Sequence, residues 1–318
     1  MNLYEILEKF PQQFSYESLE KDLSSYDGIA FCGVGGSGIV GSIATKLLEH
    51  KGYEKPLVVV KDYTLPKFVN EGFLVFCISY SGNTEETLSN FQEAVSRGIK
   101  PVCITSGGKL KELAQKENCE VYEIPKGYQP RFALGFMLSK LLNLLGISRE
   151  ELEDAKENLQ ENLSKIKETA KRLSEKLYNY VPVIYATPLT HPIAERWKGQ
   201  INENAKTPAY FAVLPEMLHN EVMGWSNPLL RSKFSYILMF DEKDHYRIKL
   251  RIDITKKILE DFGIVPELVK GEGNSYLART LYLLYVADWL SVYLAELYGY
   301  DPTEVKIIEK IKQELSNA

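Results

Sequence analysis

Cysteine and histidine are scarce in this sequence of 318 residues. The cysteines lie far apart without a CxxC pair, and three of the four fall within apolar runs typical of strands, which favours buried free thiols. They are Cys32, Cys77, Cys103 and Cys119. The four histidines stand singly, and none belongs to an HxH or HxxxH arrangement that would suit a metal ion. We therefore expect no bound metal.

Excess positive charge and long apolar runs are also missing. With 38 basic and 43 acidic residues the net charge is -5, so no overall positive field attracts nucleic acid or an anionic membrane. The N-terminal MNLYEILEKF does not resemble a signal peptide, and no apolar stretch approaches the roughly 20 residues that span a bilayer. We expect a cytoplasmic protein that binds any anionic ligand at a local site.

The patterns that are present predict two domains of the α/β class. Short apolar runs alternate with helical patterns from residue 29 and again from residue 181, which is typical of doubly wound parallel sheets in a three-layer, flavodoxin-like arrangement. Between them, over 149–178, apolar residues recur at spacings of three and four and predict one long amphipathic helix. The predicted divisions are an N-terminal domain 1–150, a connecting helix 151–180 and a C-terminal domain 181–318.

A glycine-rich loop, GVGGSG, follows the first predicted strand. Its Gly35 and Gly36 let backbone N–H groups approach a ligand, Ser37 adds a hydroxyl, and the next helix presents its positive N-terminus. This pattern indicates an anion site. A nucleotide-binding GxGxxG loop is an alternative, although Lys61 and Asp62 after the next strand count against it and no GK[ST] motif is present.

A second loop, SYSGNTEE, repeats this design two strands later. The hydroxyls of Ser79, Ser81 and Thr84 can donate to phosphate oxygens at the start of a helix. Ordinary helix capping before Glu85 remains an equal alternative for Ser81 or Thr84 taken alone. Two such loops at one sheet edge favour a compact phosphomonoester.

These loops resemble the sugar isomerase (SIS) domain, which binds phosphosugars. Three further stretches are similar to the bifunctional phosphoglucose/phosphomannose isomerases of archaea and some bacteria: GYQPRFALG (127–135), NENAK (202–206) and LPEMLHNEVMGW (214–225). The resemblance covers essentially the whole chain as two SIS-type domains. It implies a cofactor-free enzyme that interconverts glucose 6-phosphate and mannose 6-phosphate with fructose 6-phosphate through a cis-enediolate.

The resemblance also assigns roles to side chains that are ambiguous on pattern alone. Glu203, for which the pattern alone favours a solvated residue at a helix end, is implied to be the proton-transfer base. Arg131, otherwise a surface residue at a helix start, is implied to stabilise the enediolate. His219, otherwise a structural loop residue, is implied to open the sugar ring. In the family this histidine comes from the neighbouring subunit, which implies a homodimer.

The last helical pattern, after Pro302, contributes two more candidates. Thr303 and Lys310 are seven residues apart, which predicts one helical face for both, and Lys306 is a rival for Lys310. By resemblance Lys310 lies at the ring oxygen, and Thr303 replaces the glutamine of glucose-only isomerases. A smaller side chain leaves room to rotate the bond between carbons 2 and 3, so both epimers can form.

Two other readings remain open beside this one. A non-catalytic phosphosugar-sensing SIS protein uses the same loops, but such proteins usually carry a DNA-binding head, and only about 28 residues precede the first predicted strand. A glucose-6-phosphate-only isomerase is the other. A glutamine-dependent transferase is disfavoured because no N-terminal cysteine nucleophile is present.

Overall fold

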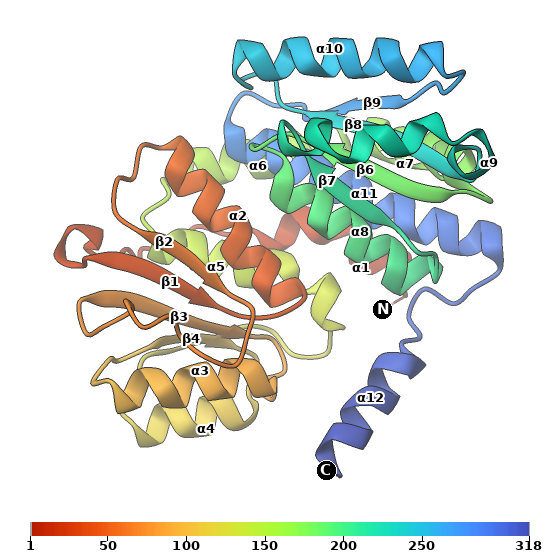
Figure 1. Ribbon diagram of the computed structural model, residues 1–318. Coiled ribbons are helices and arrows are strands. Elements are labelled where there is room, and N and C mark those ends of the chain that lie inside the picture. Colours follow the sequence, from red (N-terminus) through yellow and green to blue (C-terminus); the bar gives the residue numbers. More distant parts are fainter. Residues whose placement is uncertain (1, 318) are drawn as a thin grey trace. The chain divides into compact units, whose positions relative to one another are not determined.

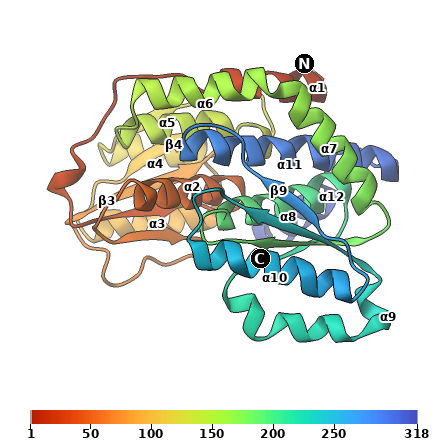
Figure 2. The same ribbon diagram turned by 90° about the horizontal axis from the view of Figure 1, so that it is seen from above.

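The computed structural model describes residues 2–317 and divides the chain into two compact units. Unit 1 comprises the chain up to Glu161 together with Glu272–Leu281. Unit 2 comprises Asn162–Gly271 and the chain from Tyr282 onward. Each unit contains its own parallel sheet, as the views in Figures 1 and 2 show. The domain division predicted from the sequence, into 1–150, 151–180 and 181–318, remains a prediction.

Unit 1 has a sheet of five parallel strands in the order β2-β1-β3-β4-β5. The strands are β1 (Gly28–Cys32), β2 (Leu57–Val60), β3 (Phe73–Ser79), β4 (Val102–Thr105) and β5 (Val121–Glu123). The helices are α1 (Leu3–Glu8), α2 (Gly36–His50), α3 (Glu85–Ser96), α4 (Gly108–Lys116), α5 (Leu134–Leu144) and α6 (Arg149–Glu161). Short 3₁₀ helices are η1 (Phe10–Gln13), η2 (Leu23–Ser25) and η3 (Pro130–Phe132).

Helices cover both faces of this sheet, with α3 and α4 on one face and α2 on the other, where it packs on α5 (Figure 1). Strands β1 and β3 are buried along their whole length because both of their faces are covered. The expectation of a doubly wound parallel domain is therefore confirmed.

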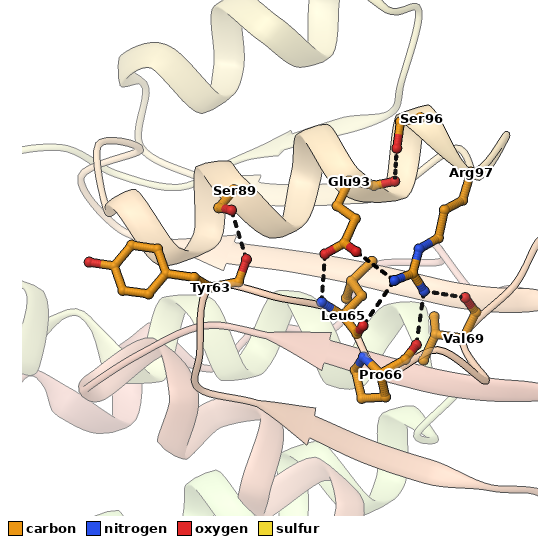
Figure 3. A network of polar contacts seen from close by, with 8 residues as sticks. All are labelled: Tyr63, Leu65, Pro66, Val69, Ser89, Glu93, Ser96 and Arg97. Carbon is orange, nitrogen blue, oxygen red and sulfur yellow. Dashed lines mark hydrogen bonds and ion pairs between the residues drawn. The ribbon is translucent and has the colours of Figure 1, made fainter.

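The connection from β2 to β3 is a loop, and α3 holds it in place (Figure 3). Arg97 donates to the carbonyl oxygens of Leu65, Pro66 and Val69 at 2.8–2.9 Å and forms an ion pair with Glu93 at 2.5 Å. Glu93 also accepts from Leu65 N, and this hydrogen bond is the main cause that lowers the pKa of its carboxyl. The loop is thus fastened to the helix that starts next to Thr84.

Unit 2 has a sheet of four parallel strands in the order β7-β6-β8-β9. The strands are β6 (Val181–Ala186), β7 (Tyr210–Val213), β8 (Phe234–Phe240) and β9 (Glu267–Lys270). The helices are α7 (Leu163–Leu177), α8 (His191–Ala205), α9 (Pro228–Arg231), α10 (Tyr246–Asp261), α11 (Tyr276–Tyr298, from Tyr282 on in this unit) and α12 (Lys306–Ser316). The 3₁₀ helices are η4 (Glu216–His219) and η5 (Glu221–Ser226).

Helix α11 is the buried centre of this part of the chain. Its side chains from Tyr282 to Val292 are almost all shielded from water, and Leu283 O accepts from the indole of Trp197 on α8 at 2.9 Å. From Tyr282 on, this apolar helix is therefore part of the core of unit 2. Across residues 2–317, no helix combines the length and apolar character needed to cross a bilayer.

One predicted element is wrong. The pattern over 149–178 predicted a single helix, but the structure has α6 and α7, which are separated at Asn162. Asn162 leaves the helical conformation with φ -91° and ψ 6°. Leu159 and Leu163 continue the apolar spacing across the break and are the reason that the pattern does not reveal it.

Candidate functional site

The glycine-rich loop of unit 1 joins β1 to α2 and is open at its tip. Gly35 has φ +58°, and a Cβ on it would meet no atom within 4 Å. A ligand can therefore approach the backbone there without contact with a side chain. Ser37 in the first turn of α2 is 8% exposed, and its hydroxyl donates to a weak acceptor, Met137 Sδ, at 3.4 Å. That hydroxyl can turn to a stronger acceptor.

The second predicted loop lies at the end of the neighbouring strand β3. Ser79 Oγ and Thr84 Oγ1 lie 3.0 Å apart, and Gly82 N donates to Ser79 Oγ at 3.1 Å. Gly82 has φ +68°, and a Cβ there would lie 1.8 Å from Gly107 O, so only glycine fits between this loop and the loop after β4.

The hydroxyls of Thr84 and Ser81 do not cap helix α3. Thr84 is the N-cap residue of α3, yet its side chain makes no capping hydrogen bond with the helix. Ser81 Oγ accepts from Asn83 N at 3.2 Å, which is a local turn and not a cap. The N-terminal N–H groups of α3 therefore receive no cap from the Thr84 side chain, which leaves this helix end suited to an anion.

Two lysines at this sheet edge, Lys61 and Lys126, were not identified as candidate phosphate ligands from the sequence. A Cβ on Gly38 would lie 3.2 Å from Lys61 Cε, so the Lys61 side chain lies over the first turn of α2. Lys126 Nζ stands in the same way beside Gly107, in the loop after β4. The sequence signal for Lys61 is its position directly after β2, because the carboxyl ends of parallel strands meet at one edge of the sheet.

Arg131 lies in η3, which packs against α2. It is 5% exposed and its guanidinium lies over the ring of Phe132, 4.9 Å from the centroid. The alternative of a surface arginine is therefore wrong. A buried guanidinium keeps its charge in any surroundings, and an aromatic face stabilises it at little desolvation cost.

In unit 2, Glu203 lies in the last turn of α8 and is half-buried. Its neighbours are fixed by hydrogen bonds: Asn202 donates to Thr207 O at 2.7 Å, and buried Asn204 donates to Ser291 on α11 at 2.9 Å. Such anchoring fixes the end of the helix from which the Glu203 side chain extends.

His219 is the last residue of η4 and is exposed. Two buried side chains, Met217 before the histidine and Trp225 after it, anchor this segment. The Trp225 indole donates to the Tyr185 hydroxyl at 2.9 Å. Burial raises the pKa of the Glu221 carboxyl in the same segment, and its contact with Tyr185 partly offsets this. His219 is therefore an exposed side chain on an anchored segment.

Thr303 and Lys310 do not share a helix, contrary to the expectation. Helix α12 begins at Lys306, and Thr303 lies in the turn before it, where its N and Oγ1 both donate to Asp301 Oδ1 at 2.7 Å. The i to i+7 spacing therefore does not place the two on one face. Lys306 forms an ion pair with Glu304 at 2.9 Å, whereas Lys310 is exposed and has no such partner among residues 2–317.

The four cysteines all belong to unit 1. Three cysteines are buried free thiols and Cys119 is half-buried. Cys32, Cys77 and Cys103 lie side by side in register on β1, β3 and β4. Burial raises the pKa of the Cys103 thiol, and contact with Cys32 together with burial raises that of Cys77. The expectation of buried thiols is confirmed for these three.

Two family models match the chain. The SIS domain matches residues 22–137, and the bacterial phospho-glucose isomerase C-terminal SIS domain matches residues 166–315. The two matches together cover the loops, Glu203, His219, Thr303 and Lys310.

Curated proteins of similar sequence extend over nearly the whole chain. A bifunctional phosphoglucose/phosphomannose isomerase of Aquifex aeolicus is 69% identical over 313 residues, which cover 98% of each chain. One of Caldicellulosiruptor bescii is 41% identical and covers 99% of each. Among solved structures, a glucose-6-phosphate isomerase like protein from Thermus thermophilus superimposes with a TM-score of 0.63 at 17% identity, over 98% of this chain and 94% of the other. This last likeness shows the fold alone.

Proposed function

The chain belongs to the bifunctional phosphoglucose/phosphomannose isomerases, and from this we propose how its residues carry out the reaction. It is an isomerase that interconverts glucose 6-phosphate and mannose 6-phosphate with fructose 6-phosphate. The observation that carries the proposal is the 69% identity with the Aquifex aeolicus relative over 98% of each chain. We place the enzyme in the cytoplasm, in glycolysis and gluconeogenesis.

The phosphate of the sugar is held in unit 1. The hydroxyls of Ser37, Ser79, Ser81 and Thr84 and the backbone of Gly35 and Gly36 donate to its oxygens. The Ser79–Thr84 pair supports this, because neither hydroxyl is used to cap α3. Lys61, which lies over the start of α2, adds positive charge at the same loop.

The chemistry is a proton transfer between carbons 1 and 2. Glu203 removes the proton from one carbon of the open-chain sugar and returns it to the other, and the negative charge that develops on the enediolate oxygen is stabilised by Arg131. A guanidinium suits this role because it neither loses its proton nor donates it to the intermediate. No metal or cofactor takes part in the proposed steps.

Ring opening precedes this transfer. His219 moves a proton between the ring oxygen and the hydroxyl on carbon 1, and Lys310 assists at the ring oxygen. We propose that His219 comes from the partner subunit of a homodimer. The exposed apolar side chains of Met223, Leu229 and Leu230, just after His219, support a second copy as the partner of this surface.

A coupled assay of fructose 6-phosphate formed from each aldose, with chelator present, tests the function. Wild-type protein is expected to be active on both sugars. Glu203→Gln should lose about 10² to 10⁴-fold in kcat, while calorimetric binding of fructose 6-phosphate changes less than about threefold, because the phosphate site is unaltered. Glu260→Gln, an exposed glutamate on α10, is the matched control and should stay active.

Near-normal turnover of Glu203→Gln would remove this glutamate from the mechanism. Wild-type protein that binds fructose 6-phosphate but turns over neither aldose would instead support a phosphosugar-sensing protein. Activity on glucose 6-phosphate alone would identify a single-substrate isomerase.

A further inference from the structure

Lys206, which follows the last residue of α8, has an unusual backbone conformation. Its φ of +53° and ψ of +29° lie in the left-handed region, where glycine or asparagine normally ends a helix. A lysine there is strained relative to glycine. Strain of this kind persists where the surrounding contacts offset it, so the contacts of the side chain matter.

The Lys206 ammonium lies among four backbone carbonyl oxygens. Two belong to the last turn of α8, Glu203 O at 2.9 Å and Asn204 O at 3.2 Å. The other two belong to the turn before α12, Asp301 O at 2.7 Å and Glu304 O at 2.9 Å. Hydrogen bonds from an ammonium are stronger than those between neutral groups, and its three N–H bonds are shared among these acceptors. Lys206 therefore joins two segments about 100 residues apart in the chain.

The two segments carry different parts of the proposed site. Glu203, the proton-transfer base, is itself one of the residues whose carbonyl Lys206 binds. Thr303 lies between the other two carbonyls, in a turn that its own bonds to Asp301 Oδ1 keep compact. Helix capping alone explains the bonds to α8, but it does not explain bonds to Asp301 and Glu304.

Helix α8 is itself held by buried hydrogen bonds to α11. Arg196 on α8 donates to Asp288 of α11 at 3.0 Å, and Gln200 donates to the same carboxylate at 2.6 Å, with all three side chains buried. Because α8 is held along its length, the placement of the Thr303 turn relative to Glu203 depends on the link at its end.

We propose that Lys206 is a positioning residue that sets the place of Thr303 relative to Glu203 and thereby the balance between the mannose and glucose reactions. The inference rests on the proposed function. The mannose reaction requires that the enediolate rotate in the space beside Thr303 before Glu203 returns the proton. A displaced Thr303 turn changes that space, and it leaves the phosphate site in unit 1 unchanged.

Two variants separate this role from a purely structural one. Lys206→Met keeps the length of the side chain and removes its donors. Lys206→Gly also removes them but accepts the left-handed conformation without strain, so its Tm should stay close to that of the wild type. Lys257→Met, an exposed lysine on α10, is the control for loss of a positive charge.

The assay measures kcat and KM for both aldoses. In both Lys206 variants kcat should fall about tenfold or more, because misplacement by about 1 Å costs up to two orders of magnitude. The ratio of kcat/KM for mannose 6-phosphate to that for glucose 6-phosphate should fall at least about threefold, while KM changes less than about threefold. Lys206→Arg should restore part of the ratio, and Lys257→Met should match the wild type.

Three results would overturn the inference. One is a Lys206→Gly protein with wild-type kcat and ratio. Another is an equal loss of both reactions with no change in their ratio. The third is a loss in Lys206→Met that follows a lower Tm and is absent from Lys206→Gly. Wild-type protein inactive on both sugars would overturn the proposed function first, and this inference with it.

Discussion

At the scale of the residue, the role proposed for Thr303 is to set how much room lies beside the sugar. Its hydroxyl is bonded to Asp301, and its side chain is half-buried. Thr303→Gln should lower kcat/KM for mannose 6-phosphate at least about tenfold and that for glucose 6-phosphate less than about threefold, because a longer side chain blocks rotation of the enediolate. Separate assays on each aldose measure the effect. Thr303→Ser keeps the hydroxyl and the turn and should keep the ratio, and an equal loss of both reactions in Thr303→Gln would contradict the steric argument.

The sequence could name residues but not their surroundings. The motif around Arg131 marks it as a candidate, yet its burial over the Phe132 ring depends on packing between η3 and α2, which no local pattern encodes. Thr84 was ambiguous for the same reason, since whether its hydroxyl caps α3 or meets Ser79 is decided by one rotamer. Lys61 went unassigned because its contact is with another loop.

At the scale of the element, a buried ion pair joins α8 to α11. Asp288→Ala would leave the Arg196 guanidinium buried without its carboxylate and should lower the free energy of unfolding by about 3–5 kcal/mol. Urea unfolding followed by circular dichroism measures this. Asp253→Ala, at an exposed position on α10, should change stability by less than about 0.5 kcal/mol. Equal effects of the two substitutions would show that the pair contributes little.

A second prediction concerns the turn between β8 and α10. Asp244 is 4% exposed and accepts from Asp241 N at 2.8 Å. Burial is the main cause that raises its pKa from 3.8 to about 6. Between these values the folded protein keeps a proton that the unfolded chain releases, so the contribution of Asp244 to stability falls as the pH rises from about 4 to about 6.

Asp244→Asn removes this dependence and keeps an oxygen that accepts the hydrogen bond. At pH 7 the variant should be more stable than the wild type by about 1–3 kcal/mol, and the gap should close near pH 4. Urea unfolding of both proteins at pH 4, 5.5 and 7 measures the gap. A difference that is the same at all three pH values would contradict a titrating Asp244.

Most of the elements follow from periodicity. The runs that alternate from residue 29 became β1 to β5 and their helices, and those from residue 181 became β6 to β9 and theirs. The break at Asn162 and the start of α12 at Lys306 could not be predicted from periodicity. In both places the apolar spacing continues past the helix end, and the backbone conformation of one or two residues decides where the helix stops.

At the scale of the whole molecule, the proposed dimer makes a prediction about mixtures. If His219 serves the Glu203 of its partner, a mixed dimer of Glu203→Gln and His219→Ala contains one intact site, because both changes fall in the other site. Random reassembly of equal amounts should then recover about a quarter of the wild-type activity. Co-refolding the two inactive variants, each with a different tag, and assaying the unfractionated mixture measures this, and the purified doubly tagged dimers should have about half of the wild-type activity. No recovery in purified mixed dimers would show that the two residues act within one chain.

The register of Cys32, Cys77 and Cys103 has a practical consequence for work on folding. All four cysteines belong to unit 1, and none lies in unit 2. Thiolates react with alkylating reagents and shielded neutral thiols do not, so a short pulse of reagent during unfolding labels the first sheet only when it opens. Mass spectrometry of the labelled chain would therefore report the opening of one unit while circular dichroism follows both.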